Sequence, residues 1–132
     1  MSNLALVALF VGSGVVLVWP ELSRLVGASN EVGTLEATRL LNQPTTLVLD
    51  VREPQEFAAG HLPKARNIPL KDLAARLDEI GKYKERAVLV ACRAGPRAGS
   101  ACRTLKRAGF TSVYQLKGGV GAWQQASLPL EK

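Results

Sequence analysis

Three short apolar runs, separated by stretches with helical spacing, constrain the fold of this chain most strongly. The runs cover residues 46–51, 87–91 and 112–116 and are rich in Val and Leu. The first two are apolar at nearly every position rather than at every second one, which is typical of strands buried in a parallel sheet. Strands that alternate with helices form α/β domains, whose ligands bind just outside the carboxyl ends of the strands. We therefore predict an α/β domain with a parallel sheet.

The segments between these runs carry helical patterns. One helical face is formed by apolar residues three or four positions apart, which are Leu70, Leu73, Leu77 and Ile80. Gly81 follows them as an end signal, and residues 98–108 suit a further helix that ends at Gly109. Thr34 can cap an earlier helix, which Pro44 stops.

The start of the chain is apolar and predicts a membrane anchor. Residues 4–19 contain no Asp, Glu, Lys or Arg, Trp19 closes the run, and Pro20 follows it. A helix over the first nineteen residues would be about 28 Å long, close to the ~30 Å thickness of a hydrocarbon core. Tryptophan is enriched at the membrane interface. We predict a single-pass membrane protein that binds lipid through residues 4–19.

A cleaved secretory signal is the alternative interpretation, because residues 26–28 offer small side chains at the spacing of a cleavage site. No Lys or Arg precedes the apolar run, however, and the run is longer than the usual about 7–15 residues. Arg24 and Arg39 lie on its C-terminal side, so the positive-inside rule predicts that the folded domain is cytoplasmic. The predicted organisation is an anchor over 1–22, a linker over 23–33 and a domain over 34–132.

Cys92 is the residue most suited to carry chemistry, because it directly follows one buried run and precedes a helix. Backbone N–H groups in such a turn, the positive helix N-terminus and the nearby Arg93 and Arg97 all favour thiolate over thiol. We expect the Cys92 pKa to fall from ~8.5 into the ~3.5–7.5 range of activated cysteines, whose thiolate is a nucleophile. A small buried residue at a strand end is the alternative.

Three blocks of sequence resemble the rhodanese family and together span residues 33–130. The first block is Leu49-Asp50-Val51-Arg52 with Glu56-Phe57, Gly60-His61-Leu62-Pro63 and Asn67-Ile68-Pro69. The second is Cys92-x-x-Gly95-x-Arg97, and the third comprises Gly109-Phe110, Val113-Tyr114-x-Leu116-x-Gly118-Gly119 and Ala122-Trp123. Their order and spacing carry the resemblance, and the apolar N-terminal segment is similar to the anchor of membrane-tethered single-domain members.

The resemblance implies a rhodanese-like sheet flanked by helices on both faces, and a sulfurtransferase that needs no cofactor and no metal. Cys92 would take a sulfane sulfur from an anionic donor such as thiosulfate, hold it as a persulfide, and pass it to a thiol or a cyanide-like acceptor. The residues expected around the donor are Arg93, Ala94, Gly95, Arg97 and Ala98. Asp50 and Arg52 are expected to support the loop, with Asp50 paired to a loop cation.

The length of the loop argues against a phosphatase. The related phosphatase and arsenate-reductase loops have the pattern Cys-x5-Arg, which wraps a tetrahedral oxyanion, whereas this chain has Cys-x4-Arg from Cys92 to Arg97. The shorter loop makes a tighter cradle that suits a single persulfide sulfur. Two positions depart from the family pattern, because Pro96 has no N–H to donate and Ala98 replaces a frequent hydroxyl residue.

The remaining candidates are interpreted as structural. Cys102 lies ten residues beyond Cys92, on the order of 15 Å along a helix, so we expect it to pack in the core. His61 matches a family motif, and attack by a preformed thiolate needs no general base. Gly118 and Gly119 lack the pattern of a phosphate loop and are expected to allow a close turn into a final helix.

The charge of the chain limits its partners. The formal net charge is +6, but the basic residues form no stripe interleaved with aromatics, so no nucleic-acid partner is predicted. A rival hypothesis is a membrane-tethered module that uses a rhodanese fold to dock a membrane-protein partner, with Cys92 incidental. The presence of both Cys92 and Arg97 favours the enzyme.

Overall fold

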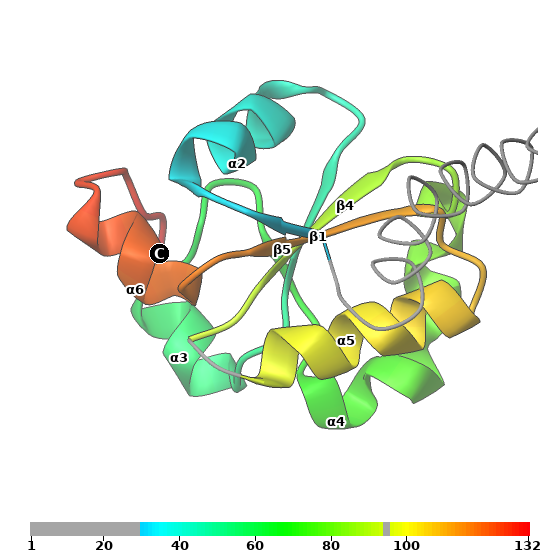
Figure 1. Cartoon of the computed structure of the whole chain (residues 1–132). Coiled ribbons are helices and arrows are strands. Elements are labelled where there is room, and N and C mark those ends of the chain that lie inside the picture. Colours follow the sequence, from blue (N-terminus) through cyan, green and yellow to red (C-terminus); the bar gives the residue numbers. More distant parts are fainter. Residues whose placement is uncertain (1–29, 94–95) are drawn as a thin grey trace, which may run out of the picture.

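The computed structural model describes residues 30–93 and 96–132 as a five-stranded sheet covered by helices (Figure 1). The strands are β1 (Asn30–Val32), β2 (Leu47–Asp50), β3 (Arg66–Asn67), β4 (Ala87–Ala91) and β5 (Ser112–Leu116). Their order is β1-β5-β4-β2-β3, and every neighbouring pair is parallel. Asp50 lies opposite Ala91 in the register of β2 and β4, so the ends of these two strands meet at one edge of the sheet.

Helices lie on both faces of this sheet. They are α2 (Thr34–Asn42), α3 (Pro54–Ala59), α4 (Leu70–Leu73), the 3₁₀ helix η1 (Ala74–Tyr83), α5 (Pro96–Arg107) and α6 (Gly119–Gln125). Side chains of α4, η1 and α5 pack against one face, and those of α2 and α6 pack against the other (Figure 1). The prediction of an α/β domain with a parallel sheet flanked by helices is therefore confirmed.

Two hydrophobic clusters, one on each face, explain why the central strands are apolar at successive positions. In β4, Val88 and Val90 pack on the side of α5, whereas Leu89 and Ala91 pack on the side of α2 and α6. Neighbouring residues of a strand point to opposite faces, so a strand covered on both sides needs an apolar residue at each position. The predicted strands at 87–91 and 112–116 are confirmed with the same bounds.

Two regions differ from the sequence prediction. Residues Asn30–Val32, which the sequence places in a linker over 23–33, form β1, which pairs with β5 and extends the sheet. Three residues are too few for a strand pattern to emerge from a sequence. The apolar face from Leu70 to Ile80 does pack on the core, but α4 passes into η1 with non-helical backbone at Arg76 and Ile80, so it is not one continuous α-helix.

The predicted anchor over 1–22, with its lipid-binding stretch 4–19, lies outside the described residues. Within residues 30–93 and 96–132, no helix is long and apolar enough to cross a bilayer.

Candidate active site

Cys92 lies at the carboxyl end of β4, in the position that the sequence predicts. Its side chain is 2% exposed and packs in the same core cluster as Val90 and Ala98. Because β4 is paired on both sides, with β2 and β5, the chain enters this turn from a fixed direction. The thiol therefore sits at the edge of the sheet where ligand sites of α/β domains form.

The loop after Cys92 leads directly into α5. Ala94 and Gly95 lie outside the described residues, so their predicted contacts with a donor stay predictions. α5 begins at Pro96, and proline suits the first position of a helix because the N–H that it lacks would have no acceptor within the helix. The side chain of Ala98 is fully buried in the core on the α5 face, so its methyl group packs against the sheet.

The start of α6 contacts the backbone of Cys92 directly. The N–H of Val120 donates to the carbonyl oxygen of Cys92 at 2.8 Å. Gly119 has a φ of +62°, and a Cβ there would lie under 3.0 Å from the carbonyl oxygens of Cys92 and Arg93. Only glycine lets α6 approach the loop this closely. The close turn predicted for Gly118 and Gly119 is confirmed, and it fixes the residue that carries the thiol.

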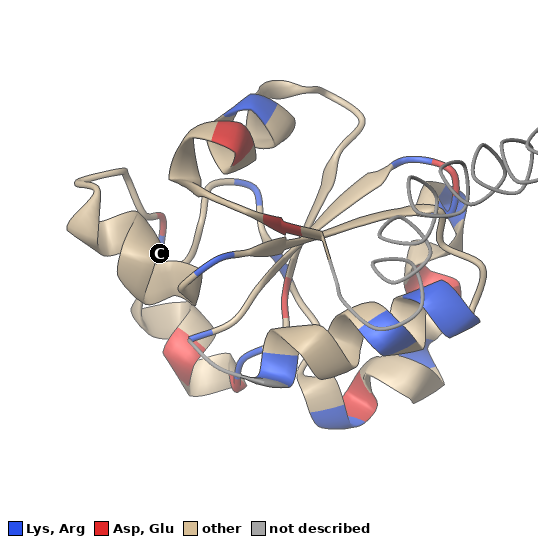
Figure 2. Cartoon of the chain, in the orientation of Figure 1, with Lys and Arg blue, Asp and Glu red and all other residues tan. Residues whose placement is uncertain are grey.

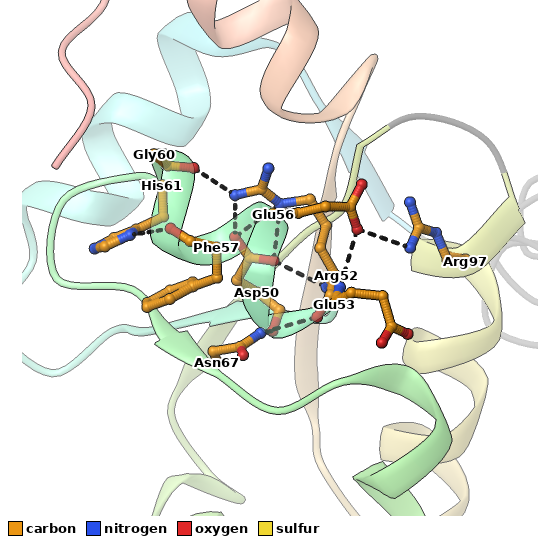
Figure 3. A network of polar contacts seen from close by, with 9 residues as sticks. All are labelled: Asp50, Arg52, Glu53, Glu56, Phe57, Gly60, His61, Asn67 and Arg97. Carbon is orange, nitrogen blue, oxygen red and sulfur yellow. Dashed lines mark hydrogen bonds and ion pairs between the residues drawn. The ribbon is translucent and has the colours of Figure 1, made fainter. Parts of the chain in front are cut away.

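A buried ion pair occupies the end of β2. The side chains of Asp50 and Arg52 are 0% and 7% exposed, and Arg52 donates to both carboxylate oxygens at 2.8–3.1 Å (Figure 3). The N–H of Arg52 adds a further bond to Asp50 at 2.9 Å, and its guanidinium also reaches the carbonyl oxygen of Gly60 at 2.6 Å. Asn67 donates to the backbone carbonyls of both members of the pair. The turn after β2 is therefore fixed by bonds that saturate the carboxylate.

The predicted pairing of Asp50 with a loop cation is wrong. Its partner is Arg52, two residues further along, because the chain turns at Val51 and brings the guanidinium back over the carboxylate. The carboxylate of Asp50 already accepts four hydrogen bonds from Arg52, so its acceptor sites are filled and it does not pair with Arg93 or Arg97. Asp50 and Arg52 thus support the site by fixing the turn that leads into α3.

The carboxylate that meets the loop arginines belongs to Glu56 on α3. Its Oε1 lies 3.3 Å from Nη1 of Arg97, and its Oε2 lies 4.0 Å from Nη1 of Arg93. Figure 2 shows the one acidic residue of α3 beside basic residues that flank the loop, and Figure 3 shows Glu56 pointing toward Arg97. The two arginines that follow Cys92 are therefore bridged by one carboxylate.

The position of Glu56 follows from local helix chemistry. The N–H of Glu53 donates to Oε1 of Glu56 at 3.0 Å, which is half of a capping box, and Pro54 occupies the first turn of α3. The bond from Glu53, together with the nearby Arg97, lowers the pKa of Glu56 below its ordinary value of 4.5. Glu56 is not among the site residues predicted from the sequence, although Pro54 with an acid two residues later indicates a helix start. Its arginine partner lies 41 residues away and leaves no local signal.

The structural interpretations of Cys102 and His61 are confirmed. Cys102 is buried in the core cluster on the α5 face, and burial raises the pKa of its thiol to about 12, so it stays protonated. Nδ1 of His61 lies 2.9 Å from the carbonyl oxygen of Phe57, and the two rings stack at 3.8 Å between centroids. Since a carbonyl can only accept, this nitrogen carries the proton and is engaged in the fold.

No group of three or more His, Cys, Asp or Glu that could hold a metal occurs among residues 30–93 and 96–132.

A model of the family described as Rhodanese-like domain matches residues 34–126. The chain belongs to the rhodanese-like family. A protein of Allochromatium vinosum named Sulfurtransferase is 37% identical over 92 residues, which cover 70% of this chain and 84% of that protein. YqhL of Bacillus subtilis, described as uncharacterized, is 45% identical over 76 residues, which cover 58% of this chain and only 59% of YqhL.

Solved structures agree with the rhodanese-like assignment. The Rhodanese_3 like domain of the Anabaena protein Alr3790 superposes with a TM-score of 0.61 at 32% identity, over 66% of this chain and 99% of that one. A rhodanese-related protein of Thermoplasma volcanium has a TM-score of 0.69 at 24% identity, over 77% and 97% of the two chains. The second similarity shows the fold alone.

Proposed function

We propose that this protein is a sulfurtransferase that moves a sulfane sulfur from an anionic donor such as thiosulfate to a thiophilic acceptor through a persulfide on Cys92. The observation that carries the proposal is the placement of Cys92 at the end of β4, followed by Arg93 and Arg97 and fixed by Gly119 and Val120. Membership in the rhodanese-like family and the name of the Allochromatium relative support sulfur transfer.

The proposed reaction consists of two nucleophilic displacements at sulfur. The thiolate of Cys92 attacks the sulfane sulfur of thiosulfate, the sulfur–sulfur bond of the donor breaks, and sulfite leaves with the electron pair. Cyanide or the thiolate form of a thiol acceptor then attacks the outer sulfur of the persulfide, the sulfur–sulfur bond breaks, and the products are thiocyanate or the acceptor's persulfide and the restored thiolate of Cys92. Neither step needs an added oxidant or a general base, which agrees with the engagement of His61 in the fold.

Charge favours this chemistry at the site. Arg93 is 78% exposed at its side chain and Arg97 is 33% exposed, so both can be reached by an anion from solvent. A cation close to the thiol stabilises the thiolate, the anionic donor and the anionic persulfide alike. In the proposed complex, Arg93 and Arg97 bind the donor together with the loop residues Ala94 and Gly95 and with the backbone of Ala98, whose side chain is buried in the core.

The test is the intact mass of the full-length protein in non-ionic detergent after treatment with thiosulfate. We expect wild type to gain the mass of one sulfur atom and to lose it again on addition of cyanide, while Cys92→Ser gains none. Cys102→Ser is the matched control, because its thiol is buried and protonated, and it should gain sulfur like wild type. No gain in folded wild-type protein would contradict the proposal and favour a rhodanese-fold binding module.

We also propose that residues 1–22 anchor the protein in a membrane as a single pass, with residues 4–19 in contact with lipid and the rhodanese-like domain in the cytoplasm. The support is the uncharged apolar run of residues 4–19. Extraction of membranes with alkaline carbonate tests the anchor, and a spanning protein stays in the pellet. Protease digestion of intact cells and of inverted vesicles tests the orientation, and only the inverted vesicles should lose the domain.

A further inference from the structure

Glu56 stands between the two arginines of the cysteine loop and partly cancels their charge. Its two carboxylate oxygens face different guanidinium groups, those of Arg97 and Arg93. Two cations and one anion leave a net charge of +1 at this point, 2 − 1 = 1. The loop that follows Cys92 is therefore less positive than its sequence indicates.

Both contacts are long for ion pairs. Charge-assisted bonds between nitrogen and oxygen are typically about 2.7–2.9 Å, whereas Glu56 lies 3.3 Å from Arg97 and 4.0 Å from Arg93. The Glu56 side chain is also 23% exposed, so water competes with these contacts. An anion that fits between the guanidinium groups can replace the carboxylate without opening the core.

The carboxylate of Glu56 is held by a hydrogen bond to its own helix. Its Oε1 accepts the N–H of Glu53 at 3.0 Å, which ties the side chain to the first turn of α3. α3 in turn follows the turn fixed by the buried pair of Asp50 and Arg52. Glu56 is thus held by a backbone bond, whereas the side chains of Arg93 and Arg97 are longer and, at 78% and 33%, more exposed than that of Glu56 at 23%.

We propose that Glu56 is a specificity-determining residue: its carboxylate occupies Arg93 and Arg97 in the resting protein, and the anionic donor must compete with it for these two guanidinium groups. This inference rests on the proposed function, since it concerns the anion that reaches Cys92. Its consequence is selection by charge. A donor with two negative charges competes well with one carboxylate, whereas small singly charged anions compete poorly and do not fill the site.

The first test measures charge selection at Cys92 without any turnover. Iodoacetate and iodoacetamide alkylate the same thiolate, but only iodoacetate is anionic. The ratio of their two rate constants therefore reports the local charge, and any change in the pKa of Cys92 cancels. Full-length protein in non-ionic detergent is used at pH 8.5, where even an unactivated thiol is about half ionised. Peptide mass spectrometry separates alkylation of Cys92 from that of Cys102.

Glu56→Gln is the decisive variant, because the amide keeps an oxygen for the N–H of Glu53 and removes only the charge. We expect the ratio of iodoacetate to iodoacetamide rate constants to rise about threefold in low salt, and the rise to shrink in high salt. Glu56→Asp, which keeps the charge, should stay near wild type. Glu79→Gln is the matched control, since Glu79 also bridges two arginines, Arg66 and Arg76, and should leave the ratio unchanged.

An unchanged ratio in Glu56→Gln would overturn the inference, and so would an equal rise in Glu79→Gln, which would mean that only the total charge matters. A Cys92 that neither reagent labels would overturn it too, because an anion bound at Arg93 and Arg97 would then have no access to the thiol.

The second test uses turnover and separates this inference from the proposed function. With thiosulfate as donor, Glu56→Gln should lower the KM about threefold and change kcat less, because a ground-state competitor has been removed. A purely structural role would not lower the KM, and an unchanged or raised KM would contradict the inference. Absence of turnover in wild type would contradict the proposed function, while the alkylation ratio would still decide the role of Glu56.

Discussion

Two carboxylate–arginine pairs lie near the candidate site, and they differ in almost every physical respect. Asp50 and Arg52 are two residues apart and buried, with bonds of 2.8–3.1 Å. Glu56 and Arg97 are 41 residues apart and partly exposed, at 3.3 Å. Figure 3 shows both pairs within one network.

This difference in burial indicates which of the two pairs can take part in binding. A buried pair cannot be separated without leaving a charge in the core, so it acts as a fixed support for the turn between β2 and α3. A partly exposed pair is worth little on its own, so its arginine can exchange one anion for another. We infer that the first pair builds the site and the second regulates what enters it.

Neutralising the buried carboxylate should have the largest effect on stability and tests whether the two pairs really differ. Asp50→Asn keeps the size of the side chain but leaves Arg52 buried without its counter-charge, so the free energy of unfolding should fall by about 3–5 kcal/mol. Urea unfolding followed by circular dichroism measures the change. Glu79→Gln at an exposed pair is the control, and a similar loss in both variants would show that burial is not the cause.

The next largest effect should appear in activity rather than stability. Arg97→Ala removes a cation from the first turn of α5, beside the cysteine loop, so kcat/KM for thiosulfate should fall about tenfold to a hundredfold. The free energy of unfolding should change by less than about 0.5 kcal/mol. Arg103→Ala, an exposed arginine of the same helix, should keep full activity. Equal losses in the two variants would mean that overall charge, and not the loop, attracts the donor.

Neutralising the exposed carboxylate should have a small effect on stability. Glu56→Gln should lower the free energy of unfolding by less than about 1 kcal/mol at low ionic strength, and by less still in concentrated salt. The measurement is the same urea titration at two salt concentrations. A loss as large as that of Asp50→Asn would remove the distinction between the two pairs.

The smallest effect concerns how the difference in unfolding free energy between wild type and Glu56→Gln depends on pH. The pKa of Glu56 is lowered in the folded protein, so its ionised form stabilises the fold above the ordinary pKa of 4.5, and this contribution disappears as the pH falls through the folded pKa. The stability advantage of wild type over Glu56→Gln should therefore be constant near neutral pH and shrink below about pH 4.5. Unfolding curves between pH 3 and pH 7 would reveal the trend, and an advantage that grew in acid would contradict it.

Local sequence patterns were sufficient for the sheet, because a strand covered on both faces needs apolar residues at successive positions. That requirement marks β4 and β2, and it places Cys92 at the end of a strand. The edge strands β1 and β3 have three and two residues, and their membership in the sheet depends on pairing with distant neighbours. No local pattern can reveal such pairing.

The parallel α/β sheet, the position of Cys92 before a helix and the two arginines that follow it can all be predicted from the sequence, because they depend on residues close together in the chain. Three contacts become visible only in the folded protein: Asp50 with Arg52, Glu56 with Arg93 and Arg97, and Gly119 with Cys92. The last two contacts join residues far apart in the chain, and the first depends on how sharply the chain turns after β2. Each of these contacts depends on how the helices pack against the sheet, which is a property of the whole fold.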